Sequence, residues 1–214
     1  GNPALARMGV DQSTGSMEGK DVRVGAALTA LWAVSTTSTS NGSVNGMHDS
    51  LTPLGGLMAM VGMWLNNVFG GVGVGFINMF IFVIVAVFVS GMMIGRTPEF
   101  LGKKVEAREM KLASLALLWH PLAILVGTGV ACYVWATPEA PGTALGWLKN
   151  PGAHGFSEML YEFSSAAANN GSGFEGLGDN TPFWNIATGL IMLLSRYIPI
   201  IAPLALAASL AAKP

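Results

Sequence analysis

Charge is scarce in this chain, and that scarcity excludes several kinds of protein. Only 11% of the 214 residues are charged, whereas soluble domains carry about 25%. A net charge of −1 and the lack of a Lys/Arg cluster argue against a nucleic-acid partner, because a phosphate backbone is bound through such clusters. The single cysteine, Cys132, lies in an apolar run, so the sequence offers no disulfide framework and no redox motif. What remains is a chain that is 51% hydrophobic with a mean hydropathy of +0.52, which indicates a membrane protein.

Three apolar segments are long enough to cross a membrane. A hydrocarbon core of about 30 Å requires about 20 helical residues. The candidates are FINMFIFVIVAVFVSGMMIG (76–95), LASLALLWHPLAILVGTGVACYVW (112–135) and FWNIATGLIMLLSRYIPIIAPLALAASLAA (183–212), the last interrupted by Arg196 and two prolines. The apolar stretches at 24–34 and 156–168 are too short to span, and their length is typical of re-entrant or interfacial helices. The sequence therefore predicts an all-α multi-pass membrane protein.

The basic residues predict the orientation of the chain. The connector between the first two spans holds Arg96, Lys103, Lys104, Arg108 and Lys111. Short loops rich in Lys and Arg stay in the cytoplasm, so this connector is expected inside. Lys213, at the far end of the third span, would lie inside as well, and the loops at 1–24 and 136–158 would lie outside.

Two uncharged polar strings, TSTSNGSV (37–44) and AAANNGSG (166–173), belong to an internal repeat. Leu31, Ser35, Asn41, Gly42 and Ser43 match Leu160, Ser164, Asn170, Gly171 and Ser172, and every pair lies 129 positions apart, as Asn41 and Asn170 do. Two predicted spans separate the copies, so both strings fall on the same, outer side and the repeat is parallel. A secondary transporter with broken helices would instead need an inverted repeat.

The polar strings have the chemistry of a binding site for a monovalent cation. Irregular backbone at membrane depth survives only where protein or a water-filled cavity surrounds it. Glycine at Gly42 and Gly171 allows a positive φ, which lets carbonyl groups point to one side. Rings of carbonyl oxygens replace the water shell of a dehydrated cation. A carboxylate ring would favour divalent ions, and neither string contains Asp or Glu.

Other interpretations of the strings are weaker. Asn-Gly is a strong signal for an ordinary hairpin turn, and NGS is a glycosylation acceptor that requires a secretory context. GSGFEG (171–176) fits the G-x-G-x-x-G pattern, but no strand precedes it, so dinucleotide binding is rejected. Repetition at a fixed offset, each time after a short apolar helix, favours a pore.

Several further residues are candidates for a role. His48 and Asp49 resemble a dyad without a nucleophile, and an outer-mouth hydrogen bond is expected there. His120 is expected to be a packed neutral imidazole, whereas Arg196 is a functional candidate because a charge inside a membrane is costly. The three histidines are too scattered for metal-ligand spacing. No acid–base or nucleophile constellation points to a membrane enzyme.

The strings NGSVNGMHDSLTPLGG, FGGVGVG, SGMMIGRTPEFLGKKVEAREMKL, NPGAHGFSEMLYEFSSAAANNGS and DNTPFWN together resemble the KdpA family. This family is the potassium-binding, channel-like subunit of the bacterial Kdp potassium-importing ATPase. The resemblance implies four helix–pore-loop–helix repeats around one selectivity filter. It also implies that this chain is partial: residues 1–111 hold the third repeat from an outer loop through pore loop, inner helix and cytoplasmic connector, and residues 112–214 hold the fourth repeat.

The resemblance also implies a set of site residues. Potassium would be bound by two filter strands, Thr39, Ser40, Asn41, Gly42, Ser43 and Ala168, Asn169, Asn170, Gly171, Ser172. The glycines of FGGVGVG, which are Gly70, Gly71, Gly73 and Gly75, would form a gating loop in a kinked inner helix below the filter.

Partners and location follow from the same resemblance. A separate P-type ATPase subunit would hydrolyse ATP, two small accessory membrane subunits would complete the complex, and the chain would lie in the bacterial inner membrane. Potassium is the only cofactor or cargo expected, and no organic cofactor is implied. The alternative is a passive or sodium-coupled potassium transporter of the same channel-like superfamily, without an ATPase partner.

Overall fold

The computed structural model describes residues 7–9, 25–67, 69–71, 73–136, 146–150 and 152–213. Within these residues the fold is helical apart from one small hairpin, which confirms the expected class. The elements are α2 (Gly25–Ser38), η1 (His48–Ser50), α3 (Pro53–Leu65), α4 (Val74–Ile94), β1 (Glu99–Phe100), β2 (Lys103–Lys104), α5 (Ala107–Ala136), α7 (Ala153–Ala168) and α8 (Pro182–Ala211). The outer loop expected at 1–24 lies almost entirely outside the described residues. Residues 153–158, expected in a loop, are helical.

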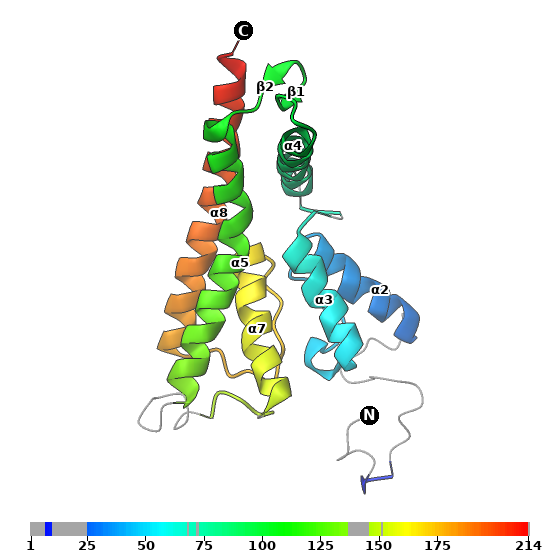
Figure 1. Ribbon diagram of the computed structural model, residues 1–214. Coiled ribbons are helices and arrows are strands. Elements are labelled where there is room, and N and C mark those ends of the chain that lie inside the picture. The colour runs from blue at the N-terminus through cyan, green and yellow to red at the C-terminus, as the bar shows by residue number, and fades with distance from the viewer. Residues whose placement is uncertain are drawn as a thin grey trace.

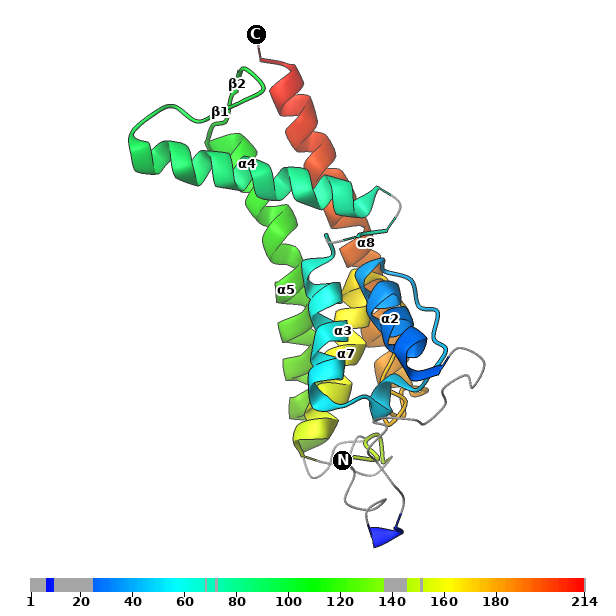
Figure 2. The same ribbon diagram turned by 90° about the vertical axis from the view of Figure 1, so that its right-hand side faces the viewer.

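Three helices are long and apolar enough to cross a membrane: α4, α5 and α8. They coincide with the three predicted spans. Arg196, Pro199 and Pro203 interrupt the apolar sequence of the last span but not its helix, because α8 continues through all three. α5 and α8 lie side by side along most of their length, whereas α4 crosses them at a steep angle (Figures 1 and 2).

The short helices α2, α3 and α7 lie in one half of the molecule (Figure 1). α7 starts beside the first turns of α8 and ends about halfway along it, and α2 and α3 lie beside the same half of the pair α5–α8 (Figure 1). α2 has 14 residues and α7 has 16, which is too short to span. Because the chain turns back after each of them, α2 and α7 have the geometry of re-entrant helices.

The repeat extends into helices that come after the polar loops. α3 begins at Pro53 and α8 begins at Pro182, each at the first helical position after a threonine. Proline suits this position because its missing N–H would have no partner there. The two copies then differ, because α8 continues for 30 residues whereas α3 ends at Leu65 and the chain restarts as α4. α3 was not predicted, because a helix of 13 residues is too short to be recognised as a span.

The opposite end of the molecule carries the basic connector. Glu99 pairs with Lys104 across a hairpin whose turn residues, Leu101 and Gly102, both have positive φ. Lys213, at the end of α8, donates a hydrogen bond of 2.9 Å to the buried Glu109 of α5. The expectation that Lys213 lies at the same end as the connector is therefore confirmed.

The interior is divided between several small apolar clusters. Met63 of α3 packs with Tyr161 of α7, and the indole N–H of Trp64 donates to Ser164 at 2.9 Å. These contacts join the two copies of the repeat. Away from them, long apolar side chains such as Phe76, Leu125 and Ile201 are exposed, as expected for helix faces that meet lipid.

Candidate functional site

The two polar loops lie against each other. The side-chain amide of Asn170 donates one hydrogen bond of 3.1 Å to the carbonyl of Asn41 and another of 3.1 Å to the carbonyl of Thr36. A Cβ added to Gly42 would lie 2.6 Å from the carbonyl oxygen of Asn170, which is closer than real contacts. Only glycine therefore permits this approach, and the sequence repeat corresponds to one shared structural feature.

Each re-entrant helix ends in the same way. Ser40 after α2 has a φ of 55° and Asn169 after α7 has a φ of 53°. In both copies the next residue donates its backbone N–H back into the last helical turn, from Asn41 to Thr36 at 3.0 Å and from Asn170 to Ser165 at 2.9 Å. The left-handed residue turns the chain away from the helix axis, so each loop starts at the helix C-terminus with the same direction.

Each asparagine also shapes its own loop. The side-chain oxygen of Asn41 accepts from the backbone N–H of Ser43 at 2.9 Å, and Asn170 accepts from Ser172 at the same distance. Such turns hold a short loop without regular secondary structure. The common Asn-x-Ser spacing of the two strings is thereby explained in structural terms.

The glycines of the two loops meet different requirements. Gly171 has a φ of 97°, as the sequence predicted. The same expectation for Gly42 is wrong, because its φ is not in the left-handed region. Gly42 is required by the close approach of Asn170 instead. The loops also differ in burial, since Asn170 and Ser172 are buried while Asn41 and Ser43 are exposed.

A cavity of about 290 Å³ lies where the two re-entrant helices end. Its polar lining residues are Ser40, Asn66, Asn78, His120, Asn169, Ser195 and Arg196. The C-termini of α2 and α7 carry no basic residue in their last turn, so neither helix compensates the negative end of its own dipole. Such ends favour a cation.

Arg196 and His120 have defined partners at this cavity. Arg196 donates from Nε to the side-chain oxygen of Asn169 at 2.9 Å, directly below the second loop. The Nε2 atom of His120 lies 3.1 Å from the carbonyl of Met63. Arg196 thus brings the one positive charge among the lining residues named above to the end of α7.

Comparison with known proteins identifies the family. The family model for KdpA, described as the potassium-transporting ATPase A subunit, matches residues 1–214. The chain belongs to the KdpA family. It is 61% identical over its full length to a protein of Parabacteroides distasonis, 60% to one of Flavobacterium johnsoniae and 55% to one of Geobacillus kaustophilus. Each of these is named a potassium-transporting ATPase potassium-binding subunit, and the chain spans only 37% or 38% of their length.

The glycine-rich break of this KdpA-family chain lies next to the first loop. Asn66, which follows the last residue of α3, has a left-handed conformation, and Gly70 and Gly73 have φ of 60° and 83° before α4 starts. The backbone N–H of Gly70 donates to Ser38, the last residue of α2, at 3.0 Å. Ser40 donates to the side chain of Asn66 at 2.6 Å. The predicted break is thus present and touches the helix end that carries the first loop.

A chain of hydrogen bonds connects the outer turn to the second loop. The Nδ1 atom of His48 lies 2.8 Å from the hydroxyl of Tyr161, and this hydroxyl lies 2.8 Å from that of Ser172. Ser172 in turn donates to the side chain of Asn170 at 2.5 Å. Because the hydroxyl proton of Ser172 is donated to Asn170, the oxygen of Ser172 can only accept from Tyr161. The hydroxyl of Tyr161 therefore donates to Ser172 and accepts from His48. Burial lowers the pKa of His48, so the neutral imidazole is favoured, and its tautomer with the proton on Nδ1 supplies the donor to Tyr161.

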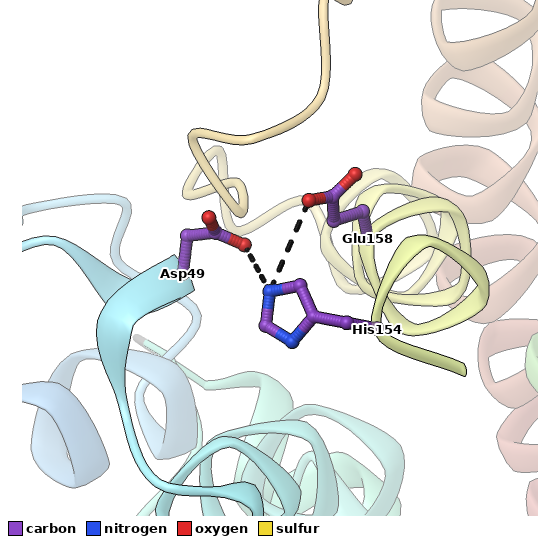
Figure 3. Close-up of side chains that lie close together, drawn as sticks. All are labelled: Asp49, His154 and Glu158. Atoms are coloured by element: carbon purple, nitrogen blue, oxygen red, sulfur yellow. Dashed lines mark hydrogen bonds and ion pairs between the residues drawn. The ribbon is translucent and has the colours of Figure 1, made fainter. Parts of the chain in front are cut away.

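A second group of side chains, close to His48, was not predicted from the sequence. Asp49 does not pair with His48, as the dyad suggested, but contacts His154 of α7, with Glu158 one turn further along (Figure 3). The three histidines are indeed far apart in the sequence, but carboxylates complete the group around His154. The spacing of four between His154 and Glu158, on one face of a helix, was the available signal.

Glu162 is a further acidic group of α7. It is only partly exposed, and burial together with the nearby charge of Asp179 raises its pKa to about 7. A Cβ added to Gly173, in the second loop, would lie 3.2 Å from its carboxylate. Glu162 therefore lies directly behind the second loop.

Proposed function

We propose that this chain supplies two of the four loops of a potassium-selective filter in the potassium-binding subunit of an ATP-driven potassium importer. The observation that carries the proposal is the contact between the two Asn-Gly-Ser loops, where Gly42 meets the carbonyl of Asn170. Two uncharged loops that come after re-entrant helices and lie together are what a carbonyl-lined cation site requires. The printed names of the three relatives support potassium as the ion.

The proposed binding residues are Thr39, Ser40, Asn41, Gly42, Ser43, Ala168, Asn169, Asn170, Gly171 and Ser172. Potassium sheds water as carbonyl oxygens of these strands replace its hydration shell. The cavity below holds the ion next, where the ends of α2 and α7 direct their negative dipole ends. Hydrolysis of ATP is assigned to a partner and not to this chain.

The broken inner helix is the proposed gate. Gly70, Gly71, Gly73 and Gly75 form the flexible part, because glycine tolerates the conformations that a moving segment visits. Its contact with Ser38 and Ser40 couples it to the first loop. The proposed division of the chain is residues 1–111 for the third repeat and 112–214 for the fourth.

The proposed setting is the bacterial inner membrane, with the loops facing outside and the connector at 96–111 facing the cytoplasm. A P-type ATPase subunit and two small accessory subunits are the proposed partners. The alternative, a passive or sodium-coupled transporter without an ATPase, receives less support, because the relatives are named as subunits of an ATPase.

The experiment measures potassium uptake by the full-length subunit in its complex, with Gly42→Asp and Gly171→Asp as test variants. Each change adds bulk and charge at the contact between the loops, and we expect the apparent affinity for potassium to fall by about tenfold or more. Gly102→Asp is the matched control, because Gly102 has a positive φ, as Gly171 does, with open space around it in the distant hairpin. Unchanged potassium affinity in both test variants would overturn the filter assignment.

A further inference from the structure

Three potential metal ligands from two separate parts of the chain converge beside η1. His154 Nε2 lies 2.7 Å from Asp49 Oδ1 and 3.9 Å from Glu158 Oε1. All three ligand atoms lie within 4.8 Å of one another. Figure 3 shows the imidazole of His154 between the two carboxylates, with Asp49 reaching in from η1 and the other two side chains from α7. We propose that Asp49, His154 and Glu158 form a binding site for a divalent transition-metal ion, with Zn²⁺ as the best match.

The donor set selects the class of ion. One imidazole nitrogen and two carboxylate oxygens suit Zn²⁺, whereas Ca²⁺ and Mg²⁺ prefer six or more oxygen ligands. Tetrahedral Zn²⁺ with ligands at about 2.0 Å separates them by about 3.3 Å. The two separations of 2.7 Å and 3.9 Å lie on either side of that value. Binding would adjust the donor atoms toward a separation of about 3.3 Å, and water would complete the coordination.

The state of Glu158 points independently to a ligand. Its side chain is wholly buried, yet among the described residues its Oε2 atom has no hydrogen-bond partner. Its Oε1 atom accepts only from the amide of Asn150, at 2.9 Å. A buried carboxylate with so few donors is costly unless a cation compensates it. An ion pair between Asp49 and His154 alone does not provide that compensation, whereas a metal ion between all three residues does.

The surroundings hold the ligands in place. Asn150 donates to both carboxylates, to Glu158 at 2.9 Å and to Asp49 at 3.2 Å. Glu175 accepts from the backbone N–H of Asp49 at 2.9 Å, which fixes the turn that carries this ligand. Gly176 closes the site, since a Cβ there would lie 2.1 Å from Glu158 Oε1. Supporting groups of this kind orient metal ligands and raise affinity.

A bound metal ion would connect the two copies of the repeat, because its ligands come from both. Asp49 belongs to the turn after the first polar loop, and His154 and Glu158 belong to the helix that carries the second. His48, next to Asp49, starts the chain of hydrogen bonds that ends at Asn170. Occupancy therefore stabilises the relative position of the two loops. The inference does not depend on which ion passes between them.

The test titrates Zn²⁺ into the purified full-length subunit in its complex, against a competing chromogenic chelator. Wild type is expected to bind one Zn²⁺ per subunit at this site. His154→Gln and Asp49→Asn, which change residues that are not fully buried, are expected to weaken that binding about 100-fold or more. Glu158→Gln keeps the shape of the buried side chain and is expected to behave in the same way. Glu99→Gln, an exposed acid in the distant hairpin, is the matched control and should bind as wild type does.

Two further readouts separate loss of the site from loss of the fold. Zn²⁺ should raise the melting temperature of wild type and Glu99→Gln but not that of the three ligand variants. X-ray absorption at the zinc edge should report nitrogen and oxygen neighbours at about 2.0 Å and no sulfur. Stoichiometric zinc that survives unchanged in His154→Gln and Asp49→Asn, or no zinc binding by wild type, would overturn the proposal.

Discussion

The side-chain amide of Asn170 donates a hydrogen bond to the backbone carbonyl of Asn41, its counterpart 129 positions earlier. The two copies of the repeat are thus hydrogen-bonded to each other through equivalent residues. The same amide also donates to Thr36 in the last turn of α2. Asn170 is buried and Asn41 is exposed. The two equivalent residues therefore have different roles, because Asn170 donates from its side chain and Asn41 accepts with its backbone carbonyl.

This contact predicts the effect of replacing the amide. Asn170→Asp turns the donor into an acceptor that faces two carbonyl oxygens, which should destabilise the fold by about 2 kcal/mol or more. We also expect weaker potassium binding, measured by isothermal titration beside a thermal melt. Asn185→Asp is the control, because Asn185 is exposed near the start of α8, where an acid is favoured. Equal stability of the two variants would contradict the prediction.

The hydroxyl of Tyr161 supports a second prediction. Tyr161→Phe keeps the ring that stacks on Phe174 with centroids 4.2 Å apart, but it removes the link between His48 and Ser172. Two buried polar groups then lose a partner, which costs about 1–3 kcal/mol for each unsatisfied group. We expect a lower melting temperature and a changed potassium affinity. Tyr197→Phe, at an exposed position, should change neither, and a Tyr161→Phe protein that melts as wild type does would refute the argument.

The raised pKa of Glu162 predicts how stability depends on pH. Its pKa is about 7 in the folded chain against 4.5 for the free group, so the folded state favours the protonated carboxyl. This contribution to stability is complete below pH 4.5 and is lost as the pH rises through 7. Glu162→Gln should therefore raise the melting temperature at pH 8 and leave it nearly unchanged at pH 4.5.

The control for this experiment is Glu99→Gln, because Glu99 is exposed in the hairpin. Melting curves of both variants and wild type at the two pH values give the comparison. A Glu162→Gln protein whose melting temperature falls with pH as steeply as that of wild type would show that another group is responsible.

The orientation can be tested with a cysteine reagent that does not cross membranes. The chain has one cysteine, Cys132, which Cys132→Ser removes. The test uses a full-length subunit from which any other cysteines have been removed as well. In intact cells we expect Asp179→Cys to react and Lys104→Cys to be protected. Both positions are exposed, but Asp179 precedes the first residue of α8, whereas the carbonyl of Lys104 accepts from Lys213 at the far end of that helix. In permeabilised cells both should react. Labelling of Lys104→Cys alone in intact cells would reverse the predicted orientation.

Sequence patterns located the long helices and the two loops, because hydropathy and a fixed repeat are properties of the chain itself. They did not locate α3, whose length is below that of a span. They also missed that α4 crosses α5 at a steep angle (Figure 2), because a crossing angle depends on packing between helices. The positive φ assigned to Gly42 failed for the same reason, since the requirement there comes from Asn170 in the other copy.

The group formed by Asp49, His154 and Glu158 shows a further limit of sequence patterns. Asp49 and His154 lie 105 positions apart, and no periodicity connects them. Only the fold brings η1 to the start of α7. The adjacent pair His48 and Asp49 suggested a local dyad, whereas the structure gives each residue a partner in the second copy of the repeat.

The two copies differ most in the helices that come after their loops. After the second loop, α8 is a continuous rod of 30 residues that packs along α5. After the first loop, the corresponding helix is divided into α3 and α4 by Asn66 and the glycines up to Gly73. The cavity is therefore lined in part by residues at this break, such as Asn66 and Gly71, and in part by residues of an unbroken helix, such as Ser195. We expect any widening of the space beneath the loops to begin at the break, and a cross-link across the break to restrict it.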